Sequence, residues 1–463
     1  MTALLWFRRD LRLSDHPALL AAADEGEVLP FVVVEPQLLT DHRPSARRML
    51  RSIAALYEAT GGALVVRCGD PVDLVPQAAA AAGAERVHIT RDTTPAGRVR
   101  DEDVGGRLQE QGAQLVTTGT PCAVGPGLVL TGEGTPYKVF TPFARAWRDH
   151  GWPAPADRVR DDVWLRDGAD LLAEVGEDGL ERVLAAADED AIDGPAGEDA
   201  AQERWRSFLR DDLAGYDTDR DRPDRDATSR MSIHLTHGEI HPRTMLADLA
   251  AHPAAGSDAA QRFVTELAWR EFYADVLWHR PDSAWADLRD ALAGLPYDDG
   301  SETDRLVEAW RQGRTGYPFV DAGMRQLLAE GFMHNRVRMV VASFLTKDLH
   351  VWWPVGARHF LDHLLDGDLA SNSHGWQWVA GTGTDASPYF RVFNPITQGE
   401  RFDPDGAYVR RWVPELAHLP GKAAHTPWTH PDGAAHGYPE RVLDHAEERR
   451  EALDRYEMAR AQT

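Results

Sequence analysis

The chain has 463 residues, of which 43% are hydrophobic and 27% charged, and its formal net charge is −24. This length predicts two or three domains, and the composition is typical of a soluble globular protein. No run of 18 apolar residues is present, which excludes a membrane-spanning helix, and the chain opens on a strand-like pattern instead of a signal peptide. The two cysteines, Cys68 and Cys122, are therefore expected to be buried free thiols in the cytoplasm.

The acidic charge is concentrated in one part of the chain. Residues 161–226 hold 22 acidic residues and eight arginines, whereas residues 301–411 are nearly neutral. Strong acidity argues against a nucleic-acid partner, because phosphate contacts dominate that kind of binding. The uneven distribution weakens this objection, since residues 301–411 can still form a locally basic surface.

The N-terminal part alternates short aliphatic runs with helical stretches. Apolar strands that alternate with helices predict a parallel sheet covered on both faces, here a Rossmann-like α/β domain over residues 1–130. No G-x-G-x-x-G or Walker loop follows the first strand. The predicted strands are 3–7, 28–34, 63–67, 86–90 and 114–118, and the predicted helices include 45–60 and 72–82, the latter between Pro71 and Gly83.

Ligands of such sheets bind at the carboxyl ends of the strands. Four polar residues follow the first two strands and are candidate contacts: Arg8, Arg9, Asp10 and Glu35. A solvated turn held by salt bridges explains these residues equally well.

The pattern changes twice after the sheet. Residues 131–200 are dominated by Asp, Glu, Ala, Gly and Pro, which predicts a long, partly helical connector. From residue 201 helical periodicity returns, and ten of the 15 tryptophans lie at or beyond Trp269. We predict an all-helical domain over residues 201–463, so the fold class is α/β plus all-α.

One predicted helix, residues 262–280, carries a mixed polar and aromatic face. Glu266, Trp269, Arg270 and Tyr273 fall at i, i+3, i+4 and i+7. The face suits a ligand, and it also fits a solvated salt-bridge surface.

A second helix is predicted over residues 333–349, where Asn335 and Arg338 share a stripe of an otherwise apolar surface. A buried arginine there must be compensated. Either a polar ligand lies beneath it, or Arg338 forms an internal ion pair with Asp366 or Asp368.

The segment 366–391 combines those carboxylates with Asn372, Trp376 and Trp378, and Trp353 lies shortly before it. Indoles usually serve core packing, but several beside one polar cavity favour a stacking platform or an electron-transfer path. We interpret the segment as the wall of a cavity for a flat, redox-active ligand. Near the start of the helical half, residues 226–232 place three hydroxyls where a helix should begin, which suits phosphate binding or simple capping.

Five motifs in order along the chain resemble the DNA photolyase and cryptochrome family, particularly the bacterial class I photolyases of cyclobutane pyrimidine dimers (CPD). The resemblance covers nearly the whole chain. The motifs are WFRRDLRLSDHP at 6–17, TPYKVFTPF at 135–143, TSRMS at 228–232, ELAWREFY at 266–273, and the almost unbroken stretch from GRTGYP at 313–318 to PGK at 420–422.

The resemblance implies FAD in the helical domain and no metal. Asn372 would lie opposite the flavin N5, where a neutral amide accommodates a reduced, anionic flavin. By motif position the FAD contacts are Tyr216, Thr228, Ser229, Met231, Ser232, Arg270, Asn335, Arg338, Asp366, Asp368 and Asn372.

The same resemblance implies damaged DNA as the partner, with the dimer flipped out of the duplex. Trp269 and Trp378 resemble the two indoles that hold the dimer, and six-four photolyases carry a histidine where this chain has Met339. The implied dimer contacts are Glu266, Trp269, Asn335, Met339 and Trp378, and the implied phosphate contacts are Arg336 and Arg391.

The implied reaction is light-driven and has no net redox change: excited reduced FAD gives an electron to the dimer, the ring bonds break, and the electron returns. The implied catalytic residues are Glu266, Asn372, Trp376 and Trp353. Trp376 and Trp353 resemble the inner and middle tryptophans of the family's photoreduction path. Gly300 stands where the third is usual. Either a gap in the loop 291–303 misaligns this position, or the path ends at another residue such as Trp352 or Tyr297.

The resemblance also implies an antenna chromophore in the α/β domain. The Asn-Glu pair that holds methenyltetrahydrofolate in some relatives aligns near Ala96 and Gly97, which favours a deazaflavin near Arg8, Arg9, Asp10 and Glu35. The absence of any antenna is the alternative. A cytoplasmic monomer is expected. The main alternative is a cryptochrome with the same flavin and no repair, and a flavin-dependent redox protein without DNA is the third.

Overall fold

The computed structural model describes residues 2–187, 194–292, 294–385 and 391–461. The chain divides into two compact units. Unit 1 comprises residues 1–137, 141–214 and 229–281, and unit 2 comprises residues 138–140, 215–228 and 282–463. None of the described helices is long and apolar enough to span a bilayer.

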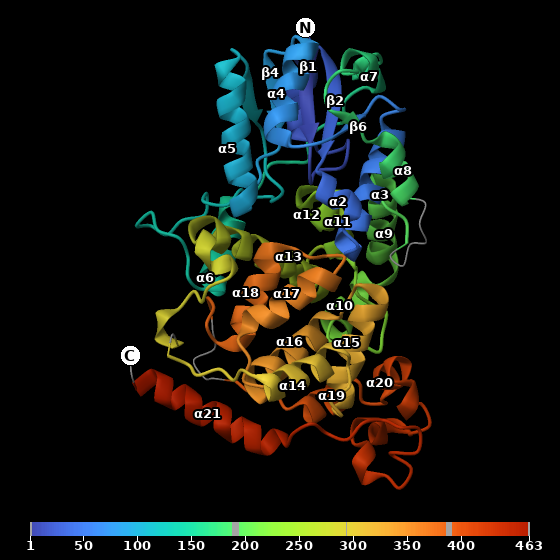
Figure 1. The fold of residues 1–463 in the computed structure, drawn as a ribbon, viewed down its shortest axis with the longest axis vertical. Helices are drawn as coiled ribbons and strands as arrows, with labels where there is room; N and C mark the ends of the chain where they lie inside the picture. Colours follow the sequence, from blue (N-terminus) through green and yellow to red (C-terminus); the bar gives the residue numbers. More distant parts are fainter. Residues whose placement is uncertain (1, 188–193, 293, 386–390, 462–463) are drawn as a thin grey trace. The chain divides into compact units, whose positions relative to one another are not determined.

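Unit 1 is built on a six-stranded sheet of order β5-β4-β1-β2-β3-β6, shown in Figure 1. Five strands are parallel, and β6 pairs antiparallel with β3. The strands are β1 (Thr2–Phe7), β2 (Glu27–Val34), β3 (Val65–Cys68), β4 (Arg86–Ile89), β5 (Gln114–Thr117) and β6 (Glu177–Asp178).

The helices of unit 1 cover both faces of this sheet. Leu5 and Phe7 of β1 face one apolar cluster with α1, α3 and α8, whereas Leu4 and Trp6 face another with α4, α5 and residues just after α7. The helices of the unit are α1 (Pro17–Ala23), α2 (Pro36–Thr40), α3 (Pro44–Ala59), α4 (Pro71–Ala82), α5 (Pro95–Glu110), α6 (Phe140–His150), α7 (Gly168–Leu171), α8 (Leu180–Ala187), α9 (Glu198–Asp211), α11 (Met231–His237), α12 (Pro242–Ala251) and α13 (Asp258–His279).

The predicted parallel α/β architecture is confirmed, and the five predicted strands and two predicted helices each match an element of the structure. Gly83 ends α4 in the left-handed conformation, with φ of 60°, as its position after the helix predicted. Both cysteines are buried and free. The two-residue strand β6 went unpredicted because it is too short to show periodicity.

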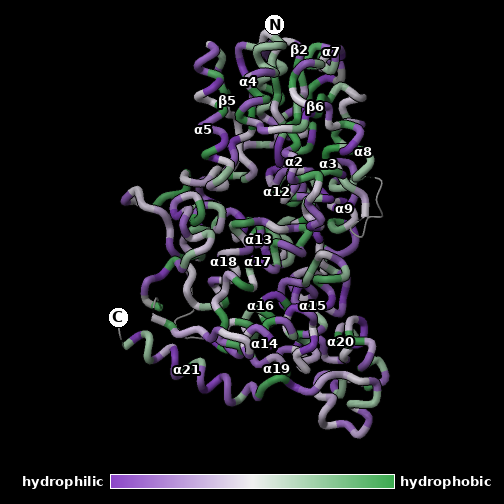
Figure 2. The backbone as a smooth tube through the Cα atoms, viewed as in Figure 1, coloured by the Kyte–Doolittle hydropathy of each residue, from purple (hydrophilic) through white to green (hydrophobic). Residues whose placement is uncertain are grey.

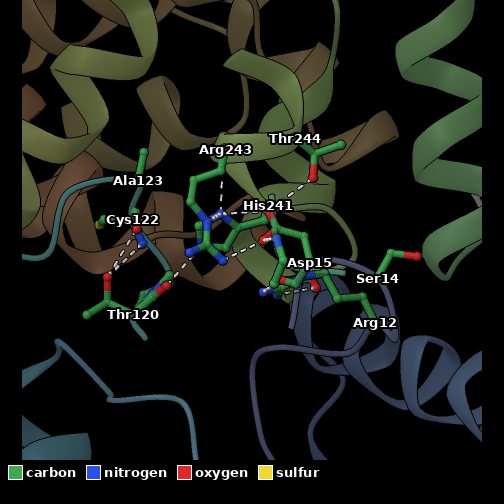
Figure 3. Close-up of polar contacts among 12 residues, drawn as sticks. Arg12, Ser14, Asp15, Thr120, Cys122, Ala123, His241, Arg243 and Thr244 are labelled. Atoms are coloured by element: carbon green, nitrogen blue, oxygen red, sulfur yellow. Dashed lines mark hydrogen bonds and ion pairs between the residues drawn. The ribbon is translucent and has the colours of Figure 1, made fainter. Parts of the chain in front are cut away.

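Helices α11 to α13 belong to unit 1, although the sequence prediction placed them in a domain over residues 201–463. A buried polar cluster explains part of this assignment (Figure 3). Asp15, which has a left-handed φ of 49°, accepts hydrogen bonds from Arg243 Nη2 at 2.5 Å and Thr244 Oγ1 at 3.1 Å. His241 caps α12, and its Nε2 lies 2.9 Å from the carbonyl oxygen of Thr120. The predicted boundaries at 130 and 200 stay predictions.

All regular elements among the described residues of unit 2 are helices, as predicted for this part of the chain, and one apolar cluster forms its core. The C-terminal helix α21 is largely hydrophilic (Figure 2). The helices are α10 (Tyr216–Asp219), α14 (Ser301–Arg311), α15 (Pro318–Glu330), α16 (Asn335–Ser343), α17 (Trp353–His363), α18 (Leu369–Ala380), α19 (Pro395–Phe402), α20 (Ala407–Trp412) and α21 (His445–Ala461).

Two predicted helices have different bounds in the structure. The helix predicted at 262–280 begins earlier, because Ser257 caps α13 by accepting from the Ala260 N–H at 3.2 Å. The helix predicted at 333–349 is wrong in its second half: α16 ends at Ser343 and a π-helical turn follows over Phe344–Asp348. Such wider turns have no simple sequence signature and are frequent at functional sites.

Candidate functional site

The predicted site residues fall in both units, and each set is described within its own unit. Within the described ranges, no group of three or more His, Cys, Asp or Glu side chains is placed to hold a metal ion. Residues 386–390 of the segment 366–391 lie outside the described residues. Unit 1 holds Ser229, Met231, Ser232, Glu266, Trp269 and Arg270, and unit 2 holds Tyr216, Thr228, Asn335, Arg336, Arg338, Met339, Trp353, Asp366, Asp368, Asn372, Trp376, Trp378 and Arg391.

In unit 2, Arg338 and Asp366 form a buried ion pair. Arg338 Nη2 donates to both carboxylate oxygens of Asp366, at 3.0 and 2.9 Å, and Arg338 Nε donates to the carbonyl oxygen of Met333 at 2.7 Å. Asp366 is 7% exposed, whereas the Arg338 side chain is 25% exposed. The internal ion pair considered from sequence is thus confirmed for Asp366, and it fixes the planar, partly exposed guanidinium of Arg338.

Asp368 and Asn372 are fixed at the beginning of α18. Asp368 is the N-cap residue and accepts from the Ser371 N–H at 2.8 Å. Asn372 Nδ2 donates to the carbonyl oxygen of Ala357 on α17 at 2.9 Å. This bond orients the half-buried amide, so that its Oδ1 is the atom left for a further contact.

Helix α16 begins with the other predicted polar contacts of unit 2. Asn335 is exposed, and His334 caps the helix by accepting from the Arg336 N–H at 3.2 Å. Burial, reinforced by Arg336 and Arg338, lowers the pKa of His334 to about 4. Arg336 itself donates to Asp221 at 2.9 Å and lies 4.3 Å from the ring centre of Phe402.

Three predicted aromatic residues of unit 2 differ in burial. Trp376 is 3% exposed and packs edge-on against Phe360, with ring centres 5.0 Å apart. This packing needs Gly356, because a Cβ there would lie 2.2 Å from Trp376 Cη2. Trp353 is fully buried, whereas Trp378 is half-buried beside the core together with Met339.

The remaining predicted contacts of unit 2 lie nearer its surface or at its edge. Tyr216 is 8% exposed, and the Arg220 guanidinium lies 5.8 Å from its ring centre. Thr228 is half-buried, and Arg391 is exposed with its guanidinium 5.9 Å from the Phe393 ring.

In unit 1, α13 presents the predicted face as a half-buried surface. Glu266, Trp269, Arg270 and Tyr273 are all half-buried, and the Trp269 and Tyr273 ring centres are 5.4 Å apart. Arg270 Nη1 donates to the carbonyl oxygen of Pro121 at 3.0 Å, which fixes the guanidinium. The predicted sharing of one face is confirmed.

The opposite face of α13 carries a residue that sequence reasoning missed. Glu271 is 2% exposed and accepts three hydrogen bonds, from Ala123 N at 2.5 Å, Val124 N at 3.0 Å and Trp147 Nε1 at 2.6 Å. Burial raises the pKa of Glu271, although the three donors act in the opposite direction. A carboxylate among apolar helix positions was the available signal.

The predicted phosphate side of unit 1 is the approach to α11. Ser229 Oγ accepts from the Met231 N–H at 3.3 Å, and Arg230 has a left-handed φ of 53°. Met231 is 1% exposed and therefore packs in the core, whereas Ser232 is exposed. Ser229 thus bonds the first N–H of α11, whereas the N-cap residue is Arg230, which makes no side-chain capping bond.

The predicted antenna residues of unit 1 are engaged in internal bonds. Arg8 donates to Asp101 and to the carbonyl oxygen of Thr90, and Arg9 Nη2 donates to Thr236 O at 3.1 Å. Asp10 pairs with His16 at 3.0 Å, and although burial alone would raise its pKa, His16 and Arg8 hold that pKa below its usual range.

Glu35 is exposed and accepts from Gln37. Thr90 Oγ1 and Trp6 Nε1 are buried polar atoms without a hydrogen-bond partner among the described residues. The salt-bridged turn considered from sequence is the arrangement seen, and the antenna stays a prediction.

Comparison with known proteins matches both halves of the chain to family models. Residues 3–159 match the model described as DNA photolyase, and residues 263–458 match the model described as the FAD binding domain of DNA photolyase. The chain is 40% identical to the deoxyribodipyrimidine photo-lyase of Streptomyces griseus, over 99% of each chain.

Solved structures give the same result. A class III photolyase from Agrobacterium tumefaciens superposes with a TM-score of 0.88 and 36% identity over 100% of this chain and 98% of its own. An archaeal photolyase from Sulfolobus tokodaii, described as holding two FAD molecules, has a TM-score of 0.82 and 27% identity over 99% of this chain and 100% of its own. The chain therefore belongs to the DNA photolyase and cryptochrome family.

Proposed function

We propose that this chain is a light-driven DNA repair enzyme that uses FAD to split cyclobutane pyrimidine dimers. The observation that carries the proposal is the similarity over the whole chain to relatives named deoxyribodipyrimidine photo-lyase. The half-buried aromatic and polar groups of α13 and α16 support it, because they are side chains suited to contacting a base. The expected location is the cytoplasm, and the expected state is a monomer.

The donor set fits a flavin dinucleotide. In unit 2, the Arg338–Asp366 pair presents a fixed planar guanidinium, and Asn372 presents an oriented amide. Hydroxyls of Thr228, Ser229 and Ser232 suit phosphate or ribityl oxygens. We propose these residues as FAD contacts together with Tyr216, Met231, Arg270, Asn335 and Asp368. When bound, the reduced flavin supplies the electron for splitting the dimer.

The protein's own contribution is to hold and orient the dimer and to exclude water. We propose that Trp269 and Trp378 supply apolar plates for the two bases, since stacking a base on an aromatic ring is worth about 1–3 kcal/mol. Glu266 and Asn335 supply hydrogen bonds to the base edges. Met339 in place of a histidine favours the cyclobutane lesion over the six-four lesion.

Two arginines are proposed phosphate contacts. The guanidinium of Arg336 pairs with Asp221 in the structure, so DNA phosphate would have to compete with that carboxylate. Arg391 is exposed, which suits a phosphate contact. Removing either charge should weaken binding and reduce its salt dependence.

A second chromophore in unit 1 is also proposed. A relative described as holding two FAD molecules supports the presence of one. The unpaired Trp6 Nε1 and Thr90 Oγ1 are polar atoms available to it. We favour a deazaflavin, and the emission spectrum of the purified protein tests this choice, because a folate spectrum would overturn it.

Repair is tested with flavin-reduced protein, an oligonucleotide containing one thymine dimer, and near-ultraviolet or blue light. The expected result is light-dependent loss of dimers, with none in the dark. Flavin photochemistry without loss of dimers would contradict repair and favour the cryptochrome alternative. A six-four oligonucleotide serves as the control for lesion choice and should remain unrepaired.

A further inference from the structure

The indole of Trp353 donates a hydrogen bond to a carboxylate inside unit 2. Trp353 is fully buried, and its Nε1 lies 2.6 Å from Asp287 Oδ1. Another buried indole of the same core, that of Trp310, donates instead to the backbone carbonyl of Val341, at 3.1 Å. A carboxylate differs from a carbonyl because it can accept a proton as well as a hydrogen bond.

The segment that carries Asp287 is fixed to α18. Gln377 Oε1 accepts from the Leu288 N–H at 2.9 Å, and Gln377 Nε2 donates to the Ser283 carbonyl oxygen at 2.7 Å. Ser283 Oγ lies 2.9 Å from His374 Nε2. Asp287 is therefore held by the same helix that carries Trp376, one residue before Gln377.

Two neighbouring residues can remove the positive charge that Trp353 carries after it loses an electron. One is Trp352, which is 40% exposed and has its ring centre 6.4 Å from that of Trp353. The other is Asp287, which can accept a proton. Gly300, where the family's third tryptophan is usual, is the N-cap residue of α14, and a Cβ there would meet open space.

We propose that Asp287 accepts the indole proton of Trp353 when Trp353 loses an electron. The inference rests on the proposed function and on the photoreduction path through Trp376 and Trp353 that the family resemblance implies. Oxidised FAD, when bound and excited by light, would supply the one-electron acceptor. As Trp353 loses its electron, its N–H bond breaks, an O–H bond forms on Asp287, and a neutral tryptophanyl radical remains on Trp353. Loss of an electron makes an indole N–H far more acidic, and the Trp353 N–H already points at a carboxylate oxygen of Asp287 that can receive the proton.

The consequence is a trapped charge separation. Return of the electron to Trp353 now requires return of the proton, which slows recombination and gives an external reductant time to act. Tyr297 lies near the same carboxylate, but burial and Asp287 raise the pKa of that phenol, so it stays protonated and does not compete as the base.

The test is flash photolysis of the protein with oxidised FAD, in which the cation and neutral radicals of tryptophan are distinguished by their spectra. Asp287→Asn keeps an oxygen that accepts the hydrogen bond but is a very weak base. Deprotonation should slow about a hundredfold, as expected for loss of a positioned base. The solvent deuterium isotope effect on that step should disappear with it.

Asp248→Asn is the matched control, because Asp248 also accepts from an indole, Trp205 Nε1 at 2.9 Å, outside the proposed path. It should leave the radical kinetics unchanged. In the flavin-free protein, the ¹⁵N–¹H signal of the Trp353 indole should shift in Asp287→Ala and not in Asp248→Asn, which verifies the bond independently of any light reaction.

Trp353→Phe separates this inference from the path on which it rests. If Trp353→Phe leaves photoreduction unchanged, both the path and the inference are wrong. If Trp353→Phe blocks photoreduction while Asp287→Asn deprotonates at the original rate, only the inference is overturned. If the neutral radical is lost in Trp352→Phe but not in Asp287→Asn, the long-lived radical belongs to Trp352 and the inference is overturned.

Discussion

Helix α13 of unit 1 and helix α18 of unit 2 both carry proposed site residues, yet different interactions hold them in place. The buried face of α13 uses carboxylates: Glu271 accepts from residues 123 and 124, and Asp275 accepts from Gly127 N at 2.7 Å. Helix α18 is anchored by shape, with Trp376 over Gly356, and by neutral groups. The position of α13 therefore depends on its buried carboxylates, and that of α18 depends on the close fit of the Trp376 side chain against Gly356.

The largest effect should come from Glu271→Ala. The change leaves three buried N–H donors without an acceptor, and since each such donor costs about 1–3 kcal/mol, the free energy of unfolding should fall by at least about 3 kcal/mol. Chemical denaturation measures the change. Glu102→Ala, at an exposed position on α5, is the control and should alter stability little. A loss below about 1 kcal/mol would mean that α13 is held by its apolar contacts alone.

The same helices show what sequence could and could not predict. The α13 face with Glu266 and Trp269 was predictable, because helical spacing alone brings these residues together. The anchoring role of Glu271 was not, since its donors, two backbone N–H groups and the Trp147 indole, lie 124 to 148 residues earlier in the chain. The Arg338–Asp366 pair was foreseen as one of two options, because a buried arginine needs a partner, but only the fold selects Asp366 and turns Asp368 into a cap.

The next largest effect should be a pH dependence of stability that arises from His374 of α18. Burial lowers the pKa of His374 from 6.5 to about 4, so the folded state keeps this residue neutral. Its contribution to stability is present above the unfolded pKa and is lost as pH falls from about 6.5 to about 4, by up to about 3 kcal/mol. Denaturation curves across this range, compared between the parent and His374→Gln, measure it. Identical pH dependence in the two proteins would mean that His374 does not contribute to the pH dependence of stability.

A smaller effect should follow Gly356→Ala. The new Cβ would lie 2.2 Å from Trp376 Cη2 and 2.6 Å from Leu345 Cδ2, and overpacking of this kind costs about 1–3 kcal/mol. Tryptophan fluorescence should report the displaced indole. Gly375→Ala is the matched control on α18, because its Cβ meets no atom within 4 Å and alanine favours a helix by about 0.5–1 kcal/mol. If both changes destabilise equally, α18 is not held by the fit of Trp376.

The smallest expected effect, Asp368→Asn, asks whether the beginning of α18 is merely a helix cap. Asparagine caps as well as aspartate, so stability should change by only a few tenths of a kcal/mol, whereas Asp368→Ala should lose about 1 kcal/mol. A carboxylate used only as a cap leaves FAD content unchanged in Asp368→Asn. A carboxylate that contacts the flavin, as proposed, lowers the FAD bound per chain, which the absorbance ratio of flavin to protein measures. Full flavin content in Asp368→Asn would mean that Asp368 serves only as a helix cap. The Arg338–Asp366 pair and Asn372 would then be the proposed polar contacts of the flavin in this part of unit 2.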